Sequence, residues 1–384
     1  MTEQKTFSLV SIDAEHGRFR VHRDAFRNQE VFEAEKELIF GKCWLYLGHE
    51  SEVAKPGQFV TRSVGGKDLI FSRARDGVAH AFYNSCTHRG AQVCREGRGS
   101  TRTFSCPYHG WVFGSDGRLM TMNATSGFPE DINADHGLNL RQVPRLENYR
   151  GLYFVNYDEN AVSLSAFLAT AKDMLDVMLD QAEGGEVVVL PGEHAYTVRA
   201  NYKSMCENSY DTYHVPVTHL SYLEYLQDRD GAGDSGTNVS SILSRYGSTG
   251  GGRGLGHGHA CTESWLPTGR PVAQWVPSWG PALKEEIEAT RERLNKRFGT
   301  ERADRIAESS KNLVIFPNLV INDNVGFTVR TIEPTGHASM NIRAWALAPA
   351  DESPALRAIR LDNFVSFLGP AGMGSADDVE MMEI

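Results

Sequence analysis

The sequence predicts an α+β protein in which a small all-β domain precedes a larger domain with an antiparallel sheet flanked by helices. Three observations support this prediction. Short β-type runs punctuated by Gly, Asp and Pro fill residues 55–157, helical periodicity returns after residue 160, and three strand-like runs follow near residues 311–348. The length of 384 residues also fits two or three domains.

We expect three segments along the chain. Residues 1–44 form an N-terminal helical segment that packs on the larger domain, residues 45–158 form the all-β domain, and residues 159–384 form the larger domain. Hydrophobic residues make up 41% and charged residues 23%, a balance typical of folded globular proteins. The formal charge is 39 − 49 = −10 without a run of Lys and Arg, so we expect no nucleic-acid partner.

The chain start lacks the pattern of a secretory signal, and no apolar run is long enough to cross a membrane. We therefore expect a cytoplasmic protein with no membrane partner. The six cysteines are too few and too scattered to staple a chain of this length, and in a reducing compartment they stay unpaired. Some of them are candidates for holding a metal.

The first half of the chain reads as a helix followed by strands. Apolar residues at helical spacing predict a helix over 27–42, which leads into a strand beginning at Cys43. The short β-type runs that follow are Phe59–Ser63, Asp68–Ser72, Ala79–Tyr83, Thr101–Ser105, Trp111–Gly114 and Gly151–Asn156.

The second half alternates helices with strands. Helices are expected at Leu164–Gln181, Tyr202–Val215, Pro281–Ser309 and Ser353–Leu368, and strands at 187–202, 311–321, 325–333 and 338–348. Pro216 should end or kink the second of these helices near Val215. Residues 227–261 are rich in Gly, Ser and Asp, which predicts a mobile loop that acts as a lid. His257 and His259 within this loop make a second metal site conceivable, but the lid is the favoured interpretation.

Two Cys-His pairs in the β domain are the strongest signal of chemistry. Cys86 and His88 are followed, after 17 intervening residues, by Cys106 and His109. Chance would produce each pair only about 0.2 times in a chain with 6 Cys and 13 His. Two thiolates on one iron and two imidazoles on the other form the Rieske type of [2Fe–2S] cluster. A structural zinc site is the alternative, although such sites usually pair Cys with Cys and His with His.

A second constellation follows the predicted helix that starts at Tyr202. Asp211 and His214 are three positions apart, which places them on one helical face, and His219 arrives from beyond Pro216. Two His and one carboxylate are the ligands that non-haem iron(II) oxygenases use. We therefore expect an iron site here. Packed or surface histidines are the alternative interpretation.

The residues Cys86-Thr-His-Arg-Gly90 and Cys106-Pro-Tyr-His-Gly-Trp111 resemble the two loops of Rieske non-haem iron ring-hydroxylating oxygenases, and the likeness extends through most of the chain. The resemblance implies that His214 and His219 bind the mononuclear iron, that Asn208 lies close to it, and that Asp211 bridges to the cluster of a neighbouring subunit. In this family the third ligand follows a Gly-Pro-Ala-Gly turn. Aligned by Gly369-Pro-Ala-Gly372, that ligand is Asp378, with Asp377, Glu380 and Glu383 as competitors. Family members usually continue well past this point, so we expect a short or missing C-terminal element.

The same resemblance implies the large (alpha) subunit of a terminal dioxygenase that adds both atoms of O₂ to an aromatic ring to give a cis-dihydrodiol. Its cofactors are a Rieske [2Fe–2S] cluster and a mononuclear Fe(II), with electrons from NADH delivered through a reductase, a ferredoxin or both. A homotrimer, or an α3β3 assembly with a small beta subunit, follows. A Rieske electron carrier and a zinc-holding binding module are the rivals from other classes, and neither explains residues 159–384 with their second constellation.

The substrate is the least determined part of the interpretation. The spacing Asn208-x-x-Asp211 resembles benzoate-type and p-cumate-type enzymes, which favours an aromatic carboxylate. A polycyclic or biphenyl-type hydrocarbon is the second candidate, and monooxygenating or demethylating relatives share all the ligands. The sequence assigns no Arg to a substrate carboxylate.

Overall fold

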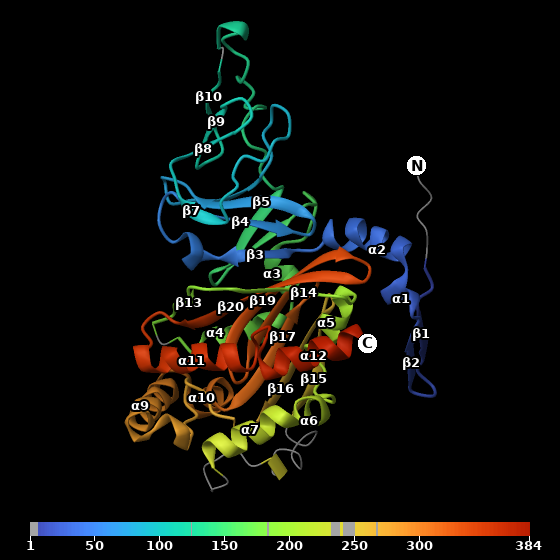
Figure 1. Ribbon diagram of the computed structural model, residues 1–384, viewed down its shortest axis with the longest axis vertical. Helices are drawn as coiled ribbons and strands as arrows, with labels where there is room; N and C mark the ends of the chain where they lie inside the picture. Colours follow the sequence, from blue (N-terminus) through green and yellow to red (C-terminus); the bar gives the residue numbers. More distant parts are fainter. Residues whose placement is uncertain (1–6, 124, 183, 232–238, 241–249, 266–267) are drawn as a thin grey trace.

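The computed structural model describes residues 7–123, 125–182, 184–231, 239–240, 250–265 and 268–384. The predicted α+β fold is confirmed, because a small β domain lies beside a larger domain whose antiparallel sheet is flanked by helices (Figure 1). In the described part of the chain, no helix is both long and apolar enough to cross a bilayer.

The chain opens with a hairpin and a broken helix. The hairpin consists of β1 (Val10–Asp13) and β2 (Arg18–Val21), and the helical part consists of α1 (Asp24–Arg27), α2 (Gln29–Glu35) and the π-helical turn η1 (Lys36–Phe40). These helices contact the larger domain, where the Lys203 ammonium lies 2.8 Å from Glu35 and the Asn201 amide donates to the carbonyl of Phe26.

The small domain contains three antiparallel sheets. Their strands are β3 (Leu45–His49), β4 (Gln58–Val64), β5 (Lys67–Arg73), β6 (Ala79–Tyr83), β7 (Arg98–Ser100), β8 (Thr103–Ser105), β9 (Val112–Gly114), β10 (Leu119–Thr121), β11 (Arg145–Tyr149) and β12 (Leu152–Asn156), with 3-10 turns η2 (Glu50–Val53) and η3 (Thr125–Gly127). The strand orders are β6-β5-β4-β7, β10-β9-β8 and β11-β12-β3.

The larger domain is organised around an eight-stranded antiparallel sheet. Its strands are β13 (Val187–Val189), β14 (His194–Val198), β15 (Gly250–Gly256), β16 (His259–Trp265), β17 (Ser309–Ile315), β18 (Leu319–Asp323), β19 (Phe327–Gly336) and β20 (Ser339–Pro349). The order is β13-β20-β19-β18-β17-β16-β15, and β14 also pairs with β20.

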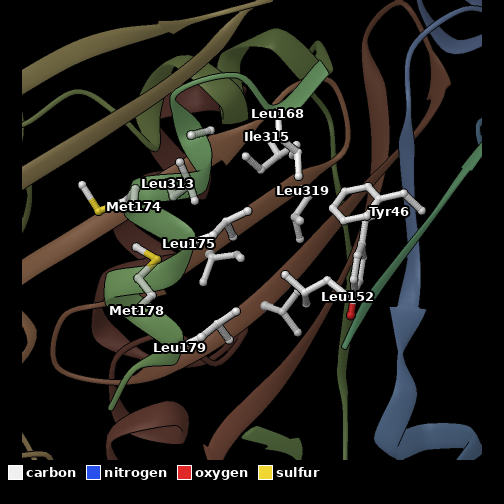
Figure 2. Packing of buried hydrophobic residues seen from close by; sticks show 14 of the residues in the cluster. Tyr46, Leu152, Leu168, Met174, Leu175, Met178, Leu179, Leu313, Ile315 and Leu319 are labelled. Carbon is white, nitrogen blue, oxygen red and sulfur yellow. The ribbon is translucent and has the colours of Figure 1, made fainter. Parts of the chain in front are cut away.

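Helices surround this sheet (Figure 1). They are α3 (Leu164–Leu168), α4 (Ala171–Leu179), α5 (Tyr202–Asn208), α6 (Val215–Thr218), α7 (Leu220–Asp230), α9 (Pro281–Phe298), α10 (Thr300–Ala307), α11 (Pro354–Ser366) and α12 (Met373–Glu383), together with the 3-10 turn η4 (Pro277–Trp279). The α4 helix packs its apolar side on one face of the sheet. Figure 2 shows Met174, Leu175, Met178 and Leu179 against Leu313, Ile315 and Leu319.

The predicted helix Tyr202–Val215 is wrong in its second half, because α5 ends at Asn208. Polar side chains beyond that point bond to the backbone and compete with helical hydrogen bonds. The hydroxyl of Ser209 donates to the carbonyl of Met205, and a carboxylate oxygen of Asp211 accepts from the N–H of Tyr213 at 2.6 Å. Pro216 then occupies the first turn of α6, where the missing N–H costs nothing.

The predicted loop 227–261 is wrong at both ends. The α7 helix continues to Asp230, and β15 and β16 form a hairpin at the edge of the sheet. Two glycines of β15 allow a close approach of the backbone. A Cβ would lie 1.9 Å from the carbonyl oxygen of Glu263 at Gly250 and 2.9 Å from that of Tyr210 at Gly252. The centre of the predicted loop, 232–238 and 241–249, lies outside the described residues.

Two further predictions missed breaks in regular elements. The run 311–321 is two strands, β17 and β18, rather than one. The expected helix Pro281–Ser309 is divided into two helices at Gly299. The φ of this glycine is 77°, which is incompatible with a right-handed helix. The acidic chain end, which contains Asp378, forms the 11-residue helix α12.

Two candidate metal centres

The two Cys-His loops of the small domain have the same backbone geometry. In the first, the N–H of Gly90 donates to the carbonyl of Cys86 at 2.8 Å, and in the second the N–H of Gly110 donates to that of Cys106 at 3.0 Å. Both glycines have φ near +70°, a conformation that other residues rarely adopt. The second loop joins β8 to β9, so the sheet fixes its two ends.

The four side chains of these loops face one another. The Nδ1 atoms of His88 and His109 are 3.1 Å apart, and the thiols of Cys86 and Cys106 are both buried. Burial, and then the adjacent Cys106 thiol, raise the pKa of Cys86, although backbone N–H groups oppose the shift. Burial, and then the nearby positive charge of His88, lower the pKa of His109, which favours the neutral imidazole that ligation requires. Trp111 stacks on His88 with 4.8 Å between the ring centroids.

This donor set fits a Rieske cluster. The buried thiols of Cys86 and Cys106 are neighbours, and the imidazoles of His88 and His109 are neighbours, which matches one iron held by two thiolates and a second held by two imidazoles. Cys94 is a buried thiol outside the two Cys-His loops, and its sulfur lies 3.5 Å from a carboxylate oxygen of Glu96.

The second centre lies where α6 and α7 meet α12. His214 caps the start of α6, and His219 stands between α6 and α7. Asp211 and His214 do come together as predicted, at 3.1 Å between Oδ2 and Nδ1, but a turn brings them together rather than a helical face.

The structure brings His214, His219 and Asp378 into one cluster whose ligand atoms lie within 4.8 Å of one another. Oδ1 of Asp378 is 3.2 Å from Nε2 of His219 and 3.5 Å from Nε2 of His214. Atoms that share one ion at about 2.1 Å are roughly 3 Å apart, so this set fits a mononuclear iron with only small shifts. Although burial opposes both shifts, the mutual hydrogen bond raises the pKa of His219 and holds that of Asp378 below its usual value.

The competing acidic residues occupy other positions. Asp377 lies on the Nδ1 side of His219, at 3.5 Å, so it supports the ring from behind. Glu383 pairs with Arg199 at 2.7 Å and ties the end of α12 to the residue that follows β14. Gly374 lets α12 pack closely against the ring of Phe367, because a Cβ at this position would lie 2.3 Å from that ring.

Asn208 lies beside the same cluster, as predicted. Its amide nitrogen donates to Oδ1 of Asp378 at 3.0 Å and lies 3.4 Å from Nε2 of His214. This contact joins the end of α5 to α12 and orients the carboxylate toward the histidines.

A cavity of about 840 Å³, counted out to its mouth, opens beside His214, His219 and Asp378. Its lining combines apolar side chains, from α7 and from Phe367 and Leu368, with polar side chains of the sheet. The sheet residues include Asn312, Asn322, Asn324 and Arg330. No motif marks these residues in the sequence, although polar residues at alternate positions of otherwise apolar strands are a usable signal.

His257 and His259 do not form a metal site. Both ring nitrogens of the buried His259 bond to the backbone, Nε2 to the carbonyl of Phe167 at 2.9 Å and Nδ1 to the N–H of Phe316 at 3.1 Å. His257 packs against the ring of Phe167. The conceivable second site is therefore a structural contact.

Two family models match the chain. One describes the Rieske [2Fe–2S] domain and covers residues 43–144, and the other describes the catalytic domain of the ring-hydroxylating alpha subunit and covers residues 187–384.

Individual proteins extend the match to nearly the full chain. The 2-halobenzoate 1,2-dioxygenase large subunit of Burkholderia cepacia is 33% identical over 97% of this chain and 78% of its own length. The toluate 1,2-dioxygenase subunit alpha of Pseudomonas putida is 32% identical over 97% of this chain and 80% of its own. A solved structure of naphthalene 1,2-dioxygenase with indole bound in the active site superposes with a TM-score of 0.80 at 30% identity, covering 93% of this chain and 77% of that one.

The ligand geometry and the comparisons agree on the same cofactors, a Rieske [2Fe–2S] cluster in the small domain and a mononuclear non-haem iron in the larger one. The chain therefore belongs to the family of large (alpha) subunits of Rieske non-haem iron aromatic-ring-hydroxylating dioxygenases.

Proposed function

We propose that this chain is the large subunit of a cytoplasmic terminal oxygenase that converts an aromatic carboxylate, such as benzoate or p-cumate, into its cis-dihydrodiol. The observation that carries the proposal is the cluster of His214, His219 and Asp378 beside a cavity lined by both apolar and polar side chains. The apolar lining suits an aromatic ring, and the polar lining suits an ionised substituent.

The names of the relatives support this substrate class. Those reported above with the highest identity are a halobenzoate enzyme and a toluate enzyme, both of which are named for aromatic acids. A neutral polycyclic hydrocarbon is the second candidate, because the superposed structure is a naphthalene dioxygenase.

The side chains around the second centre have distinct roles in the proposed reaction. His214, His219 and Asp378 hold the iron, which supplies the activation of O₂ when it is bound. Asn208 orients Asp378 by donating to Oδ1. Asp211 accepts from Nδ1–H of His214 and so holds the ring with Nε2 directed at the metal site. His219 is buried and the side chain of Asp378 is 13% exposed, so little of this donor pair is open to solvent.

Electrons originate from NADH and reach the cluster through a reductase, a ferredoxin or both. Within one chain β8 and β9, which flank the second Cys-His loop, lie in the upper part of Figure 1, and α6, which follows His214, lies in the lower part. The cluster and the mononuclear site of one chain are therefore far apart for electron transfer. A neighbouring copy could place its own cluster next to this mononuclear site, which supports a homotrimer or an α3β3 assembly with a small beta subunit.

Asp211 is placed for such a contact. Its side chain is 43% exposed, and it lies in a surface groove that the N-terminal hairpin also lines through Phe19 and Val21. One carboxylate oxygen holds His214, so the exposed side of the group can accept from a cluster histidine of the next subunit.

The proposal assigns electron transfer to residues 45–158 and catalysis to residues 159–384, with residues 1–44 packed on the catalytic domain. The ion pair between Lys203 and Glu35 supports the last assignment.

The test is a product screen with purified enzyme, reductase, ferredoxin and NADH. Benzoate, p-cumate, 2-chlorobenzoate and naphthalene are supplied separately, and products are identified by mass spectrometry. A cis-dihydrodiol from an acid supports the proposal. Formation of a dihydrodiol from naphthalene alone selects the second candidate, and demethylated or singly hydroxylated products alone contradict dioxygenation.

A further inference from the structure

The cavity beside the mononuclear site is bounded by an unusually polar stretch of sheet. Strand register places Thr262 opposite Asn312, Asn312 opposite Asn322, and Asn322 opposite Thr328. These side chains occupy one face, because alternate residues of a strand point the same way. The opposite face carries the apolar side chains of the core, among them Leu313, Ile321 and Val329.

The amides of this polar row satisfy one another. The side-chain nitrogens of Asn322 and Asn324 donate to the Oδ1 of Asn312 at 2.8 and 3.1 Å, and the hydroxyl of Thr328 lies 3.4 Å from Oδ1 of Asn322. The row is a neutral network that needs no ligand.

Arg330 differs from this network. It lies two residues beyond Thr328 on the same face of β19, lines the cavity and is only 4% exposed. Its Nε has no hydrogen-bond partner, and no carboxylate of the described residues forms an ion pair with its guanidinium.

Other buried cations of the molecule do have carboxylates. Arg270 lies 2.6 Å from Asp323, and Lys311 lies 3.2 Å from the same carboxylate. Arg360 pairs with Glu352, and Arg62 with Glu52.

A buried charge without a counterion is strongly unfavourable, so the missing anion should come from the cavity. The cavity also contains the carboxylate of Asp378, but that group is engaged by His219 at 3.2 Å and Asn208 at 3.0 Å. Two buried hydroxyls of the cavity wall, those of Thr268 and Ser310, are also without partners among the described residues. Unpaired donors therefore remain on the sheet side of the cavity.

We propose that Arg330 binds the carboxylate of the aromatic substrate and thereby selects aromatic acids over neutral arenes. This inference rests on the proposed function, whose substrate class it ties to one residue. The planar guanidinium offers paired N–H donors that match a carboxylate. With the acid group held on the sheet, the ring lies between the apolar side chains of α7, such as Leu223 and Leu226, and the edge of the cavity that carries the iron ligands.

The test is equilibrium binding to the oxidised holoenzyme without reductase, measured by calorimetry with benzoate and with benzamide, its neutral counterpart of the same shape. Arg330→Met keeps the length of the side chain and removes its charge, whereas Arg330→Lys keeps the charge and removes the planar donor pair. Arg343→Met is the matched control, because this arginine of the same sheet is 50% exposed and pairs with Glu193.

We expect wild type to bind benzoate more tightly than benzamide, and Arg330→Met to weaken benzoate binding by about 30-fold or more while benzamide binding changes by less than about threefold. Arg330→Lys should lie between the two, and Arg343→Met should match wild type. An equal loss for both ligands, or no loss for benzoate, overturns the assignment. If Arg330→Met does not fold, the assignment is tested by two other results: the preference of wild type for benzoate over benzamide, and a selective loss of benzoate affinity in Arg330→Lys. Wild type that oxidises naphthalene yet binds no aromatic acid overturns this inference and leaves ring dihydroxylation standing.

Discussion

The two metal centres differ in how much of the fold each one needs. The facing histidines of the cluster site, His88 and His109, are 21 positions apart on two loops of one small domain. At the mononuclear site, the contact between Asn208 and Asp378 spans 170 positions and depends on α12 lying against α5 and α7. The first centre is thus fixed by local loop geometry, whereas the second requires the end of the chain to dock. We expect the two centres to fail independently when their ligands are changed.

The largest expected effect separates the two centres completely. His88→Ala should abolish the Rieske absorption and electron paramagnetic resonance signals. His214→Ala should keep those signals, lose the mononuclear iron and reduce turnover below detection, because two remaining protein ligands hold the ion poorly. Iron analysis and spectra of protein purified without oxygen are the measurements. Loss of the cluster signal in His214→Ala would show that the centres depend on one another and would contradict the comparison.

The next effect tests which carboxylate completes the second centre. Asp378→Ala should lose the mononuclear iron, because Oδ1 of this residue faces both histidines. Asp377→Ala should weaken iron binding by about 10- to 100-fold without abolishing it, since this residue supports only the far side of His219. Iron titration of the two variants decides between them, and the reverse ranking would mean that Asp377 is the ligand.

The same contrast explains how much could be predicted from sequence. The loops at Cys86 and Cys106 are short and ordered by their own backbone hydrogen bonds, so residue spacing alone indicated the donor set. For Asp378 the spacing gave no indication, and only the resemblance of the Gly-Pro-Ala-Gly turn singled it out. The neighbouring Asp377 shares the local sequence, but its carboxylate faces Nδ1 of His219, whereas that of Asp378 faces Nε2. The direction of each carboxylate depends on how α12 docks.

The errors in the predicted fold have separate physical causes. Helical periodicity continued past Asn208, but Ser209 and Asp211 form side-chain hydrogen bonds that end α5. The glycines of 250–256 suggested a loop, but this segment pairs with β16 as a strand, in which Gly250 and Gly252 allow a close approach. Nothing in the sequence marks Arg330, because the missing hydrogen-bond partner of its Nε is visible only in the folded structure.

A smaller effect concerns communication between the centres of neighbouring subunits. Asp211→Asn keeps the size of the side chain and removes its charge, so both metals should assemble and the cluster should still reduce. Its electron should reach the iron about 10- to 100-fold more slowly, because the charged link between imidazoles is weakened. Rapid mixing of the reduced enzyme with substrate and O₂ follows the reoxidation of the cluster.

The control for this experiment is Glu207→Gln, which removes a negative charge from the same surface groove. Its cluster should reoxidise at the wild-type rate. Wild-type reoxidation in Asp211→Asn itself would reject the bridge between subunits.

The smallest effect concerns the joint between the two domains. Glu333 of β19 accepts hydrogen bonds from the N–H groups of Gly65 and Gly66, which turn the β4–β5 hairpin, at 2.8 and 2.6 Å. Burial raises the pKa of Glu333 from 4.5 to about 6, although these two donors oppose the shift. The folded protein therefore holds this proton more tightly than the unfolded chain does. The resulting stabilisation is complete below pH 4.5 and is lost as the pH rises through 6.

Glu333→Gln cannot ionise, so it should remove that dependence on pH. Relative to the variant, wild type should lose about 1 kcal/mol between pH 4.5 and 6.5, which is about 2–4 °C in Tm for domains of this size. The lost acceptor of the variant costs the same at every pH, so only the difference in slope is diagnostic. Glu193→Gln, at an exposed ion pair with Arg343, should run parallel to wild type. Parallel Tm curves for wild type and Glu333→Gln would mean that the carboxylate titrates alike in the folded and unfolded chain, and that the joint is insensitive to its charge.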